Sequence, residues 1–332
     1  MTKKILVWFF TVLFFQGANH AALSKTLDPE IEAFICEMAD KHDFDALELR
    51  ALFRQVKTQS EIIKAIAAPA TARPWHEYRA RTINDQRIRN GVKFWDEHAQ
   101  TLARAREQYG VPEEIIVATL GVETRYGKST GKYRVLDALT TLAFDYPSRA
   151  EFFKSELEEY LLFTRDRHIN PLHLKGSYAG AMGMPQFIPS SYRDYAVDFD
   201  GDGKSNLWTS AADAIGSIAN YYQTYGWQPE QDIALPAILA EDAPRSVLAQ
   251  GVKPHTSIAE LQKTGVIPRA AVADETLAAV FSLEEEDGEQ VWLALNNFYV
   301  ITRYNRSVNY AMAVYELSQE LRVARDMRTF PR

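Results

Sequence analysis

The sequence predicts a mainly α-helical protein that contains a small, partly β insertion. Apolar residues recur at helical spacing along most of the 332 residues, and helix-start signals precede them. Between about Gln228 and Asn296, this pattern is interrupted by Pro236, Pro244, Pro254 and Pro268, and helical spacing returns afterwards. We therefore expect an N-terminal helical domain over 23–110, a helical core over 111–227, an α+β insertion over 228–296, and a C-terminal helix over 297–332 that completes the core.

Residues 1–22 have the pattern of a secretory signal. Lys3 and Lys4 precede an apolar run from Ile5 to Phe15, and small residues follow it. The run is shorter than the ~20 apolar residues that span a membrane. We expect cleavage near Ala21 or Ala22; an uncleaved inner-membrane anchor is the alternative.

The N-terminal helical domain begins with a clear helix start at Asp28, Pro29 and Glu30. The next residues carry an apolar stripe at helical spacing, formed by Ile31, Phe34, Ile35 and Met38. The only cysteine, Cys36, lies within this segment, so no intrachain disulfide can form. We interpret Cys36 as a packing residue.

Later helices and one hairpin follow from the same kind of pattern. Ala279 to Leu283 and Gln290 to Leu295 face each other across an acidic turn containing Asp287 and Gly288, which predicts a β-hairpin. The helical stripes are Phe153, Leu157, Tyr160 and Leu161; then Ile215, Ile218 and Tyr222; and finally Ala311, Val314, Tyr315, Leu317 and Leu321.

Glu123 is the residue most indicative of chemistry. It ends an apolar helical run in which Pro112 is the expected first helical residue and Gly127 the expected stop. Burial in such surroundings favours the protonated form of a carboxyl and suits a general acid. A glutamate at a helix end is more often a solvated surface residue, so position alone does not establish this role.

The segment from Gly176 to Phe187 suits a sugar-binding cleft. Its small residues let backbone segments approach closely, while its Tyr, Gln and Phe side chains offer stacking and hydrogen bonds.

Several motifs together resemble the lytic murein transglycosylase B family. The resemblance runs in the expected order from about Phe34 to about Leu321, and it rests on the residues 74–79 (PWHEYR), 121–127 (GVETRYG), 136–139 (LDAL), 180–187 (GAMGMPQF) and 303–311 (RYNRSVNYA). It implies a lysozyme-like core, a periplasmic location and cleavage of the MurNAc–GlcNAc β-1,4 bond of peptidoglycan glycan strands. No acylated cysteine follows the signal, so lipid anchoring is not expected.

The resemblance also implies a mechanism with one carboxyl. Glu123 would protonate the glycosidic oxygen and then, as a carboxylate, take the proton of the muramic acid C6 hydroxyl, which attacks C1 and leaves a 1,6-anhydro end. Ordinary glycosidases use two carboxyls. Asp137 and Asp145 are the nearby candidates for a second one, and Asp137 is better explained as a structural or capping residue.

The same resemblance assigns a substrate-binding set. Ser177 and Gln186 are implied as sugar-binding or charge-stabilising groups, and Asn305 as a polar residue that faces the site. The implied aromatic cleft positions are Tyr78, Tyr221, Tyr304 and Tyr310. Without the resemblance, most of these tyrosines would be interpreted as ordinary packing residues.

Residues 198–209 match the first half of an EF-hand calcium loop. Asp198, Asp200 and Asp202 stand at positions one, three and five, glycine stands at six, and Lys204 at seven supplies a backbone carbonyl. Position twelve is Thr209, so the usual closing glutamate is missing. Asp213, just beyond the loop, resembles an acidic position that could close the site in this family. We expect a structural Ca²⁺ here, with a solvated polar turn as the alternative. No cofactor is expected for the chemistry.

Composition and charge limit the classes of molecule that the protein is expected to bind. The formal net charge of −7 and the lack of a basic stripe argue against a nucleic-acid partner. Proteins of cell-wall synthesis or division are additional candidate partners. A hydrolytic muramidase, a non-catalytic peptidoglycan-binding scaffold and a calcium sensor are the alternative functions, and the single incomplete loop argues against the last.

Overall fold

The computed structural model describes residues 26–329, and these form two compact units. The first comprises the described residues up to Gln55, and the second begins at Val56. The division coincides with none of the boundaries expected at 110, 227 and 296. The expected signal segment 1–22 lies outside the described residues. Within residues 26–329, no helix combines the length and apolar character that crossing a membrane requires.

The first unit contains helices α1 (Pro29–His42) and α2 (Ala46–Phe53). The expected start of α1 is confirmed, because the Asp28 carboxylate accepts a hydrogen bond from the backbone N–H of Glu30 at 2.8 Å. Phe34, Ile35 and Met38 are buried. Cys36 is exposed, so its interpretation as a packing residue was wrong. At about 100° per residue, Cys36 faces away from the side of the helix that carries the buried stripe.

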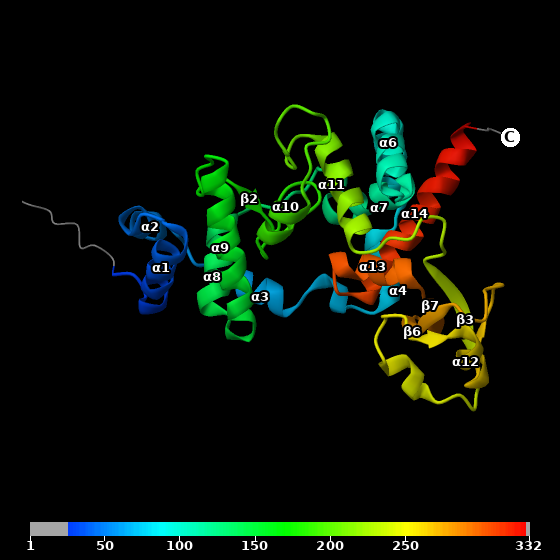
Figure 1. Ribbon diagram of the computed structural model, residues 1–332. Coiled ribbons are helices and arrows are strands. Elements are labelled where there is room, and N and C mark those ends of the chain that lie inside the picture. The colour runs from blue at the N-terminus through cyan, green and yellow to red at the C-terminus, as the bar shows by residue number, and fades with distance from the viewer. Residues whose placement is uncertain (1–25, 330–332) are drawn as a thin grey trace, which may run out of the picture. The chain divides into compact units, whose positions relative to one another are not determined.

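The second unit holds the other helices and all the strands of the described chain (Figure 1). Its helices before the sheet are α3 (Ser60–Ala67), α4 (Trp75–Thr82), α5 (Asp85–Glu97), α6 (Ala99–Tyr109), α7 (Glu113–Thr124), α8 (Val135–Asp145), α9 (Ala150–Asp166), α10 (Pro189–Tyr195) and α11 (Ala211–Thr224). Its last helices are α12 (Ile258–Lys263), α13 (Asn296–Tyr304) and α14 (Val308–Thr329).

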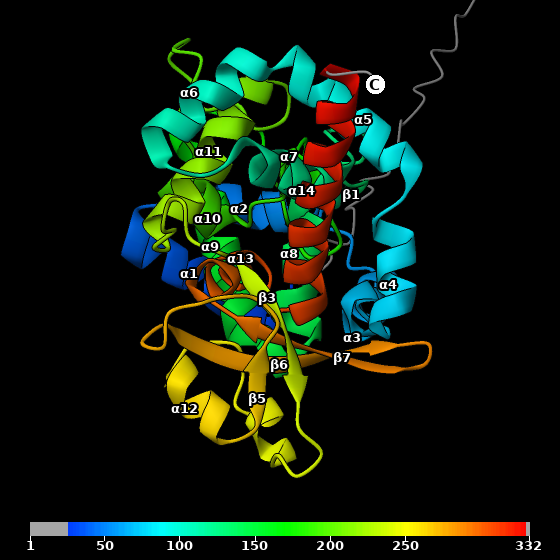
Figure 2. The same cartoon turned by 90° about the vertical axis from the view of Figure 1, so that its right-hand side faces the viewer.

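Helices α7 and α8 form the centre of the helical core. Most residues of both helices are buried, which is typical of a helix surrounded by others. Helix α14 packs against α7, and α9 packs against α8 (Figure 2). The stripes expected from the sequence are confirmed, since Phe153, Leu157, Ile218, Val314 and Leu317 are all buried. The C-terminal helix therefore does return to the core.

A five-stranded antiparallel sheet occupies the segment between α11 and α13. Its strand order is β4 (Thr256–Ser257), β6 (Leu277–Glu285), β7 (Gly288–Ala294), β3 (Ala234–Leu239), β5 (Val266–Pro268). Strands β6 and β7 pair from Glu285 opposite Gly288 to Ala279 opposite Ala294, which confirms the expected hairpin. One face of the sheet and α12 share an apolar cluster that includes Ile258, Val280 and Leu293.

Candidate active site

Glu123 lies in the last turn of α7. The helix begins at Glu113, with Pro112 as its N-cap, so the expected start was one residue too early. It ends because Arg125 takes a left-handed conformation with φ 53°, followed by Tyr126 at 62° and Gly127 at 81°. The chain reversal that was expected at Gly127 therefore starts two residues earlier, directly after Thr124.

The carboxyl of Glu123 is held by one tyrosine. The hydroxyl of Tyr310, on α14, donates a hydrogen bond of 2.6 Å to Oε1 of Glu123. Burial raises the pKa of Glu123 to about 7, and the hydrogen bond from Tyr310 opposes this shift. The carboxyl can therefore hold or release a proton near neutral pH, as a general acid and base requires. The side chain of Glu123 is half-buried, so the burial that the apolar run predicts is confirmed in part.

Tyrosines from four helices surround this carboxyl. The charge of Glu123 helps to raise the pKa values of Tyr78 on α4, Tyr222 on α11 and Tyr310, although burial is the larger cause for each. Tyr304 stacks on Tyr310 with ring centroids 6.3 Å apart. Tyr221 lies against Tyr304 at 4.8 Å and donates a hydrogen bond to the carbonyl oxygen of Arg303. The structure thus brings Tyr78, Tyr304 and Tyr310 around Glu123, with Tyr221 behind Tyr304.

The glycine-rich segment meets the end of α7 directly. The Thr124 hydroxyl donates a 2.8 Å hydrogen bond to the carbonyl oxygen of Met184 and accepts one from the Gly127 amide. At Gly183, which has φ 69°, a Cβ atom would lie 2.6 Å from the backbone oxygen of Leu207; at Gly176 it would lie 2.2 Å from that of Ala181. The close backbone approach expected from the small residues is confirmed.

The polar residues of the predicted substrate-binding set have different surroundings. Ser177 Oγ accepts hydrogen bonds from the amides of Ala179 and Ala181, so it holds its own turn. Gln186, with φ 53°, donates from Nε2 to the carbonyl oxygens of Thr130 and Gly183. Asn305 is exposed just after α13, and its side chain makes no hydrogen bond to another described residue. Asn305 is therefore the freest of the three to meet a ligand.

No second catalytic carboxyl is evident among the described residues. Asp137 is buried, and its oxygens accept hydrogen bonds from Arg134 at 2.7 Å and from the Lys57 amide at 3.1 Å. These contacts fit its interpretation as a structural residue. Burial raises the pKa of Glu123, the hydrogen bond from Tyr310 opposes this shift, and no other carboxylate contributes.

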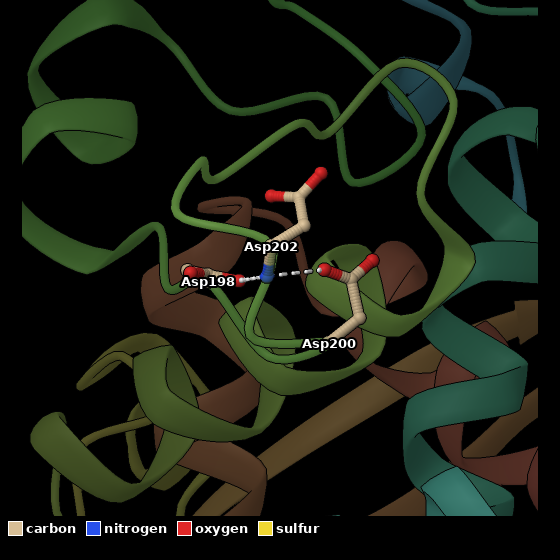
Figure 3. A group of neighbouring side chains, drawn as sticks. All are labelled: Asp198, Asp200 and Asp202. Atoms are coloured by element: carbon tan, nitrogen blue, oxygen red, sulfur yellow. Dashed lines mark hydrogen bonds between the residues drawn. The ribbon is translucent and has the colours of Figure 1, made fainter.

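The loop after α10 brings three aspartates together. One carboxylate oxygen each from Asp198, Asp200 and Asp202 lies within 4.8 Å of the others, and all three side chains are exposed. Figure 3 shows the amide of Asp202 donating to Asp198 at 3.1 Å and to Asp200 at 3.2 Å. Asp198 also accepts from the amides of Gly201 and Gly203. Oxygen-rich clusters of this kind suit Ca²⁺.

Asp213 and Lys204 make hydrogen bonds that hold the backbone of this loop. Asp213 is fully buried at the start of α11, and its oxygens accept hydrogen bonds from the amides of Phe199, Asp200 and Asn206. It lies outside the three-aspartate group and fixes the loop backbone, and its expected role as closing ligand stays a prediction. The amide of Lys204 donates to Asp202 at 2.8 Å.

Sequence reasoning missed two supporting residues. Thr124 joins α7 to the glycine-rich segment, and Thr119 contacts the Tyr222 hydroxyl at 2.9 Å. Thr119 stands four residues before Glu123, on the same helical face, so helical spacing offered a signal for it. The link from Thr124 to Met184 had no comparable signal, because the two residues are 60 positions apart.

Comparison with known proteins identifies relatives of this chain. A family model described as the transglycosylase SLT domain matches residues 26–319. Membrane-bound lytic murein transglycosylase B of Escherichia coli (strain K12) is 44% identical over 308 residues, which are 90% of this chain and 84% of that protein.

Solved structures show the same similarity in three dimensions. Soluble lytic transglycosylase SltB1 of Pseudomonas aeruginosa is 47% identical with a TM-score of 0.84, over 90% of this chain and 100% of that one. E. coli Slt35 in complex with calcium is 44% identical with a TM-score of 0.82, over 90% and 94%. SltB3 of P. aeruginosa, in complex with NAG-anhNAM-pentapeptide, is 29% identical with a TM-score of 0.74, over 88% and 79%.

Proposed function

The chain belongs to the transglycosylase SLT family and is a peptidoglycan lytic transglycosylase, and we propose that Glu123 acts as its single acid and base. The observation that carries this proposal is the pKa of Glu123, which burial raises to about 7 with no second carboxylate contributing. A group that must first give a proton and then take one works best when its pKa is near the working pH.

In the first step, Glu123 donates its proton to the oxygen that links MurNAc to GlcNAc, and the bond from that oxygen to C1 of MurNAc breaks. In the second step, the Glu123 carboxylate takes the proton of the C6 hydroxyl of the same MurNAc, and O6 bonds to C1. The proton is thereby restored to Glu123, and water is not consumed. Holding O6 near C1 replaces a bimolecular encounter by an internal one.

Tyr310 prepares Glu123 for both steps. Its hydroxyl has a pKa well above the usual value, so it stays protonated and donates to Oε1 throughout. The hydrogen bond orients the carboxyl and stabilises its charged form after the first step. We propose that Tyr78, Tyr221, Tyr304, Ser177, Gln186 and Asn305 line the glycan groove, as the family resemblance implies.

Product analysis tests this mechanism. Digestion of purified peptidoglycan should release fragments that end in 1,6-anhydro-MurNAc, lack a reducing end, and are lighter by one water than hydrolysis products. Mass spectrometry before and after borohydride treatment distinguishes the two. Fragments that borohydride reduces, without anhydro species, would assign the site to a hydrolytic muramidase.

We propose further that Asp198, Asp200 and Asp202 hold a structural Ca²⁺, with the Lys204 carbonyl as an additional ligand. The three clustered carboxylates support this, and Slt35, a relative, has been solved with calcium. Calcium should raise the melting temperature, because a ligand of the folded state stabilises it. The shift should vanish in the double variant Asp198→Ala/Asp202→Ala and persist in Asp287→Ala, which changes an aspartate on the β6–β7 turn. If calorimetry detects no calcium binding at millimolar concentration, the loop is a polar turn that holds no metal.

We propose a periplasmic location on the basis of the N-terminal sequence pattern and the substrate. N-terminal sequencing of the protein isolated from the periplasmic fraction tests it. A start near Leu23 supports cleavage, whereas an intact Met1 in the membrane fraction supports the uncleaved anchor.

A further inference from the structure

A cavity of about 200 Å³ lies beside the active-site helix, and arginines dominate its lining. Arg81 comes from the end of α4, Arg87 from α5, and Arg125 from the turn that ends α7; amide side chains and Tyr126 complete the wall. No carboxylate lines it. The cavity is distinct from the three-aspartate loop and from the tyrosines that surround Glu123.

The turn that carries Arg125 is held firmly. Arg125 and Tyr126 both have positive φ, a conformation that costs energy in residues other than glycine. Tyr126 is buried, and its hydroxyl donates a 2.9 Å hydrogen bond to the carbonyl oxygen of Arg87. Its ring fills the space over Gly91 and Gly121, where an added Cβ atom would lie 2.3 and 2.6 Å from the hydroxyl oxygen. The position of Arg125 is therefore set by a packed side chain.

The positive charges in the cavity lack a counter-ion within the described chain. The guanidinium groups of Arg81 and Arg125 make no hydrogen bond or ion pair with another described residue, although the backbone carbonyl of Arg81 accepts a hydrogen bond from Asn84. The guanidinium of Arg87 donates only to the carbonyl oxygen of Thr82. Burial lowers the pKa of Arg87, and the charge of Arg125 lowers it further, so these two guanidinium groups face one another closely enough to repel.

The other arginines of α4 and α5, together with the one just before α4, are all paired. Arg73 pairs with Glu77, Arg79 with Glu316, and Arg89 with Asp85. Positive charge is thus neutralised around the cavity and left unneutralised inside it. A group of guanidinium forks without acidic partners is suited to bind a carboxylate or a phosphate.

The cavity is close to the reaction centre. Arg125 follows Glu123 by two residues, and the side chain of Tyr78 is influenced by the charges of both Glu123 and Arg87. The cavity wall and the catalytic carboxyl therefore share the same end of α7. The volume suits one amino-acid-sized group and is too small for a disaccharide.

We propose that Arg81, Arg87 and Arg125 bind a carboxylate of the peptide stem that the muramic acid residue carries. The proposal rests on the glycan cleavage proposed above. It gives the enzyme a means to prefer MurNAc with a stem over MurNAc without one, because the stem adds charge-assisted hydrogen bonds that the bare glycan cannot make.

Kinetics on two substrates test the proposal. The intact enzyme and the variants Arg81→Gln and Arg125→Gln are compared on peptidoglycan that carries stems and on the same glycan after an amidase has removed them. The ratio of kcat/KM for the two substrates should fall about tenfold in each variant, which corresponds to ~1.4 kcal/mol. Arg89→Gln, on α5 outside the cavity, should keep the ratio of the intact enzyme. Arg81→Gln serves as the second variant, should a change at the left-handed Arg125 impair folding.

A binding measurement identifies the ligand. Calorimetry uses a free stem tetrapeptide, its derivative with amidated carboxyl groups, and inorganic phosphate. The tetrapeptide should bind the intact enzyme, and both the amidated peptide and the two variants should show weaker binding. Unchanged substrate ratios in both variants, or binding of phosphate without the peptide, would overturn the proposal. Loss of cleavage on both substrates by the intact enzyme would instead overturn the proposed function.

Discussion

A half-buried carboxyl makes Glu123 useful for catalysis and costly for stability. Its pKa in the folded protein is about 7, above the ordinary value of 4.5. The folded state therefore binds its proton more tightly than the unfolded state between these pH values. Stability from this group is complete below pH 4.5 and is lost as the pH rises toward 7.

Replacement of Glu123 by glutamine separates these two effects. Glu123→Gln should reduce turnover by at least ~10²-fold, because the amide cannot give and recover a proton. The same variant should be more stable than the unchanged enzyme at pH 8, by a free energy of unfolding on the order of 1–3 kcal/mol, and should therefore melt at a higher temperature. At pH 4 the two proteins should differ little in stability. Glu320→Gln, an exposed site on α14, is the control for both assays. A well-folded Glu123→Gln enzyme with near-normal turnover would contradict the single-acid mechanism.

Tyr310 should set the upper pH limit of activity. The reaction starts with protonated Glu123, so kcat/KM should fall as the pH rises above about 7. The hydrogen bond from Tyr310 lowers the pKa of Glu123, so Tyr310→Phe should move this fall to higher pH while reducing kcat. A pH–rate profile of both enzymes measures the shift. A fall at the same pH in both would show that the hydrogen bond does not tune Glu123.

At the scale of elements, the glycine-rich segment reaches the site because its backbone passes very close to other backbone. Gly183 and Gly226 both have left-handed φ values, 69° and 89°, but only Gly183 faces a backbone oxygen, that of Leu207, at 2.6 Å from an added Cβ. Alanine costs about the same conformational strain at either position. The difference in stability between the two alanine variants therefore measures only the effect of the close backbone approach at Gly183.

Gly183→Ala should consequently destabilise the protein more than Gly226→Ala. We expect a difference of about 1–3 kcal/mol in the free energy of unfolding, with lower turnover only for Gly183→Ala, whose neighbour Met184 is tied to the end of α7. Denaturant melts of both variants give the comparison. Equal destabilisation would mean that the segment can move away from Leu207 without cost.

Elements were predictable where local pattern decides them. The mainly α, lysozyme-like fold with a small sheet is confirmed, and the turn at Asp287 and Gly288 between two apolar runs was enough to predict β6 and β7. The helical stripe around Cys36 was also correct, but the face that Cys36 occupies was assigned wrongly, because a stripe broad enough to bury Ile35 does not extend to the next residue. The three backbone amides that donate to Asp213 were not predictable, because spacing along the chain does not reveal them.

At the scale of the whole molecule, the site is assembled from distant pieces. Glu123 itself followed from its helix, whereas its partner Tyr310 is 187 positions away and lies on another helix. Periodicity indicates only that each helix buries a face. The family resemblance supplied the tyrosines, and it could not supply the arginine cavity, because the unpaired state of Arg81 and Arg125 depends on which carboxylates the folded chain places elsewhere.

The division of the chain at Gln55 leads to a prediction for the whole molecule. Every residue proposed for catalysis, glycan binding or calcium binding lies in the unit that begins at Val56. The start of this unit is anchored internally: the Lys57 amide donates to Asp137, and the Gln59 amide donates to Thr141 at 3.2 Å, both on α8. A chain that begins at Val56 therefore keeps its own core, its sheet and its site.

We expect this shortened protein to unfold in one cooperative transition and to release 1,6-anhydro fragments at a rate of the same order as the longer chain, since a compact unit with its own core can fold alone. Calorimetry and product analysis on soluble glycan fragments measure both properties, with Glu123→Gln in the shortened protein as the inactive control. A protein that folds but does not cut would show that helices α1 and α2 contribute to catalysis. A protein that fails to fold would show that the second unit depends on the first, in spite of its self-contained packing.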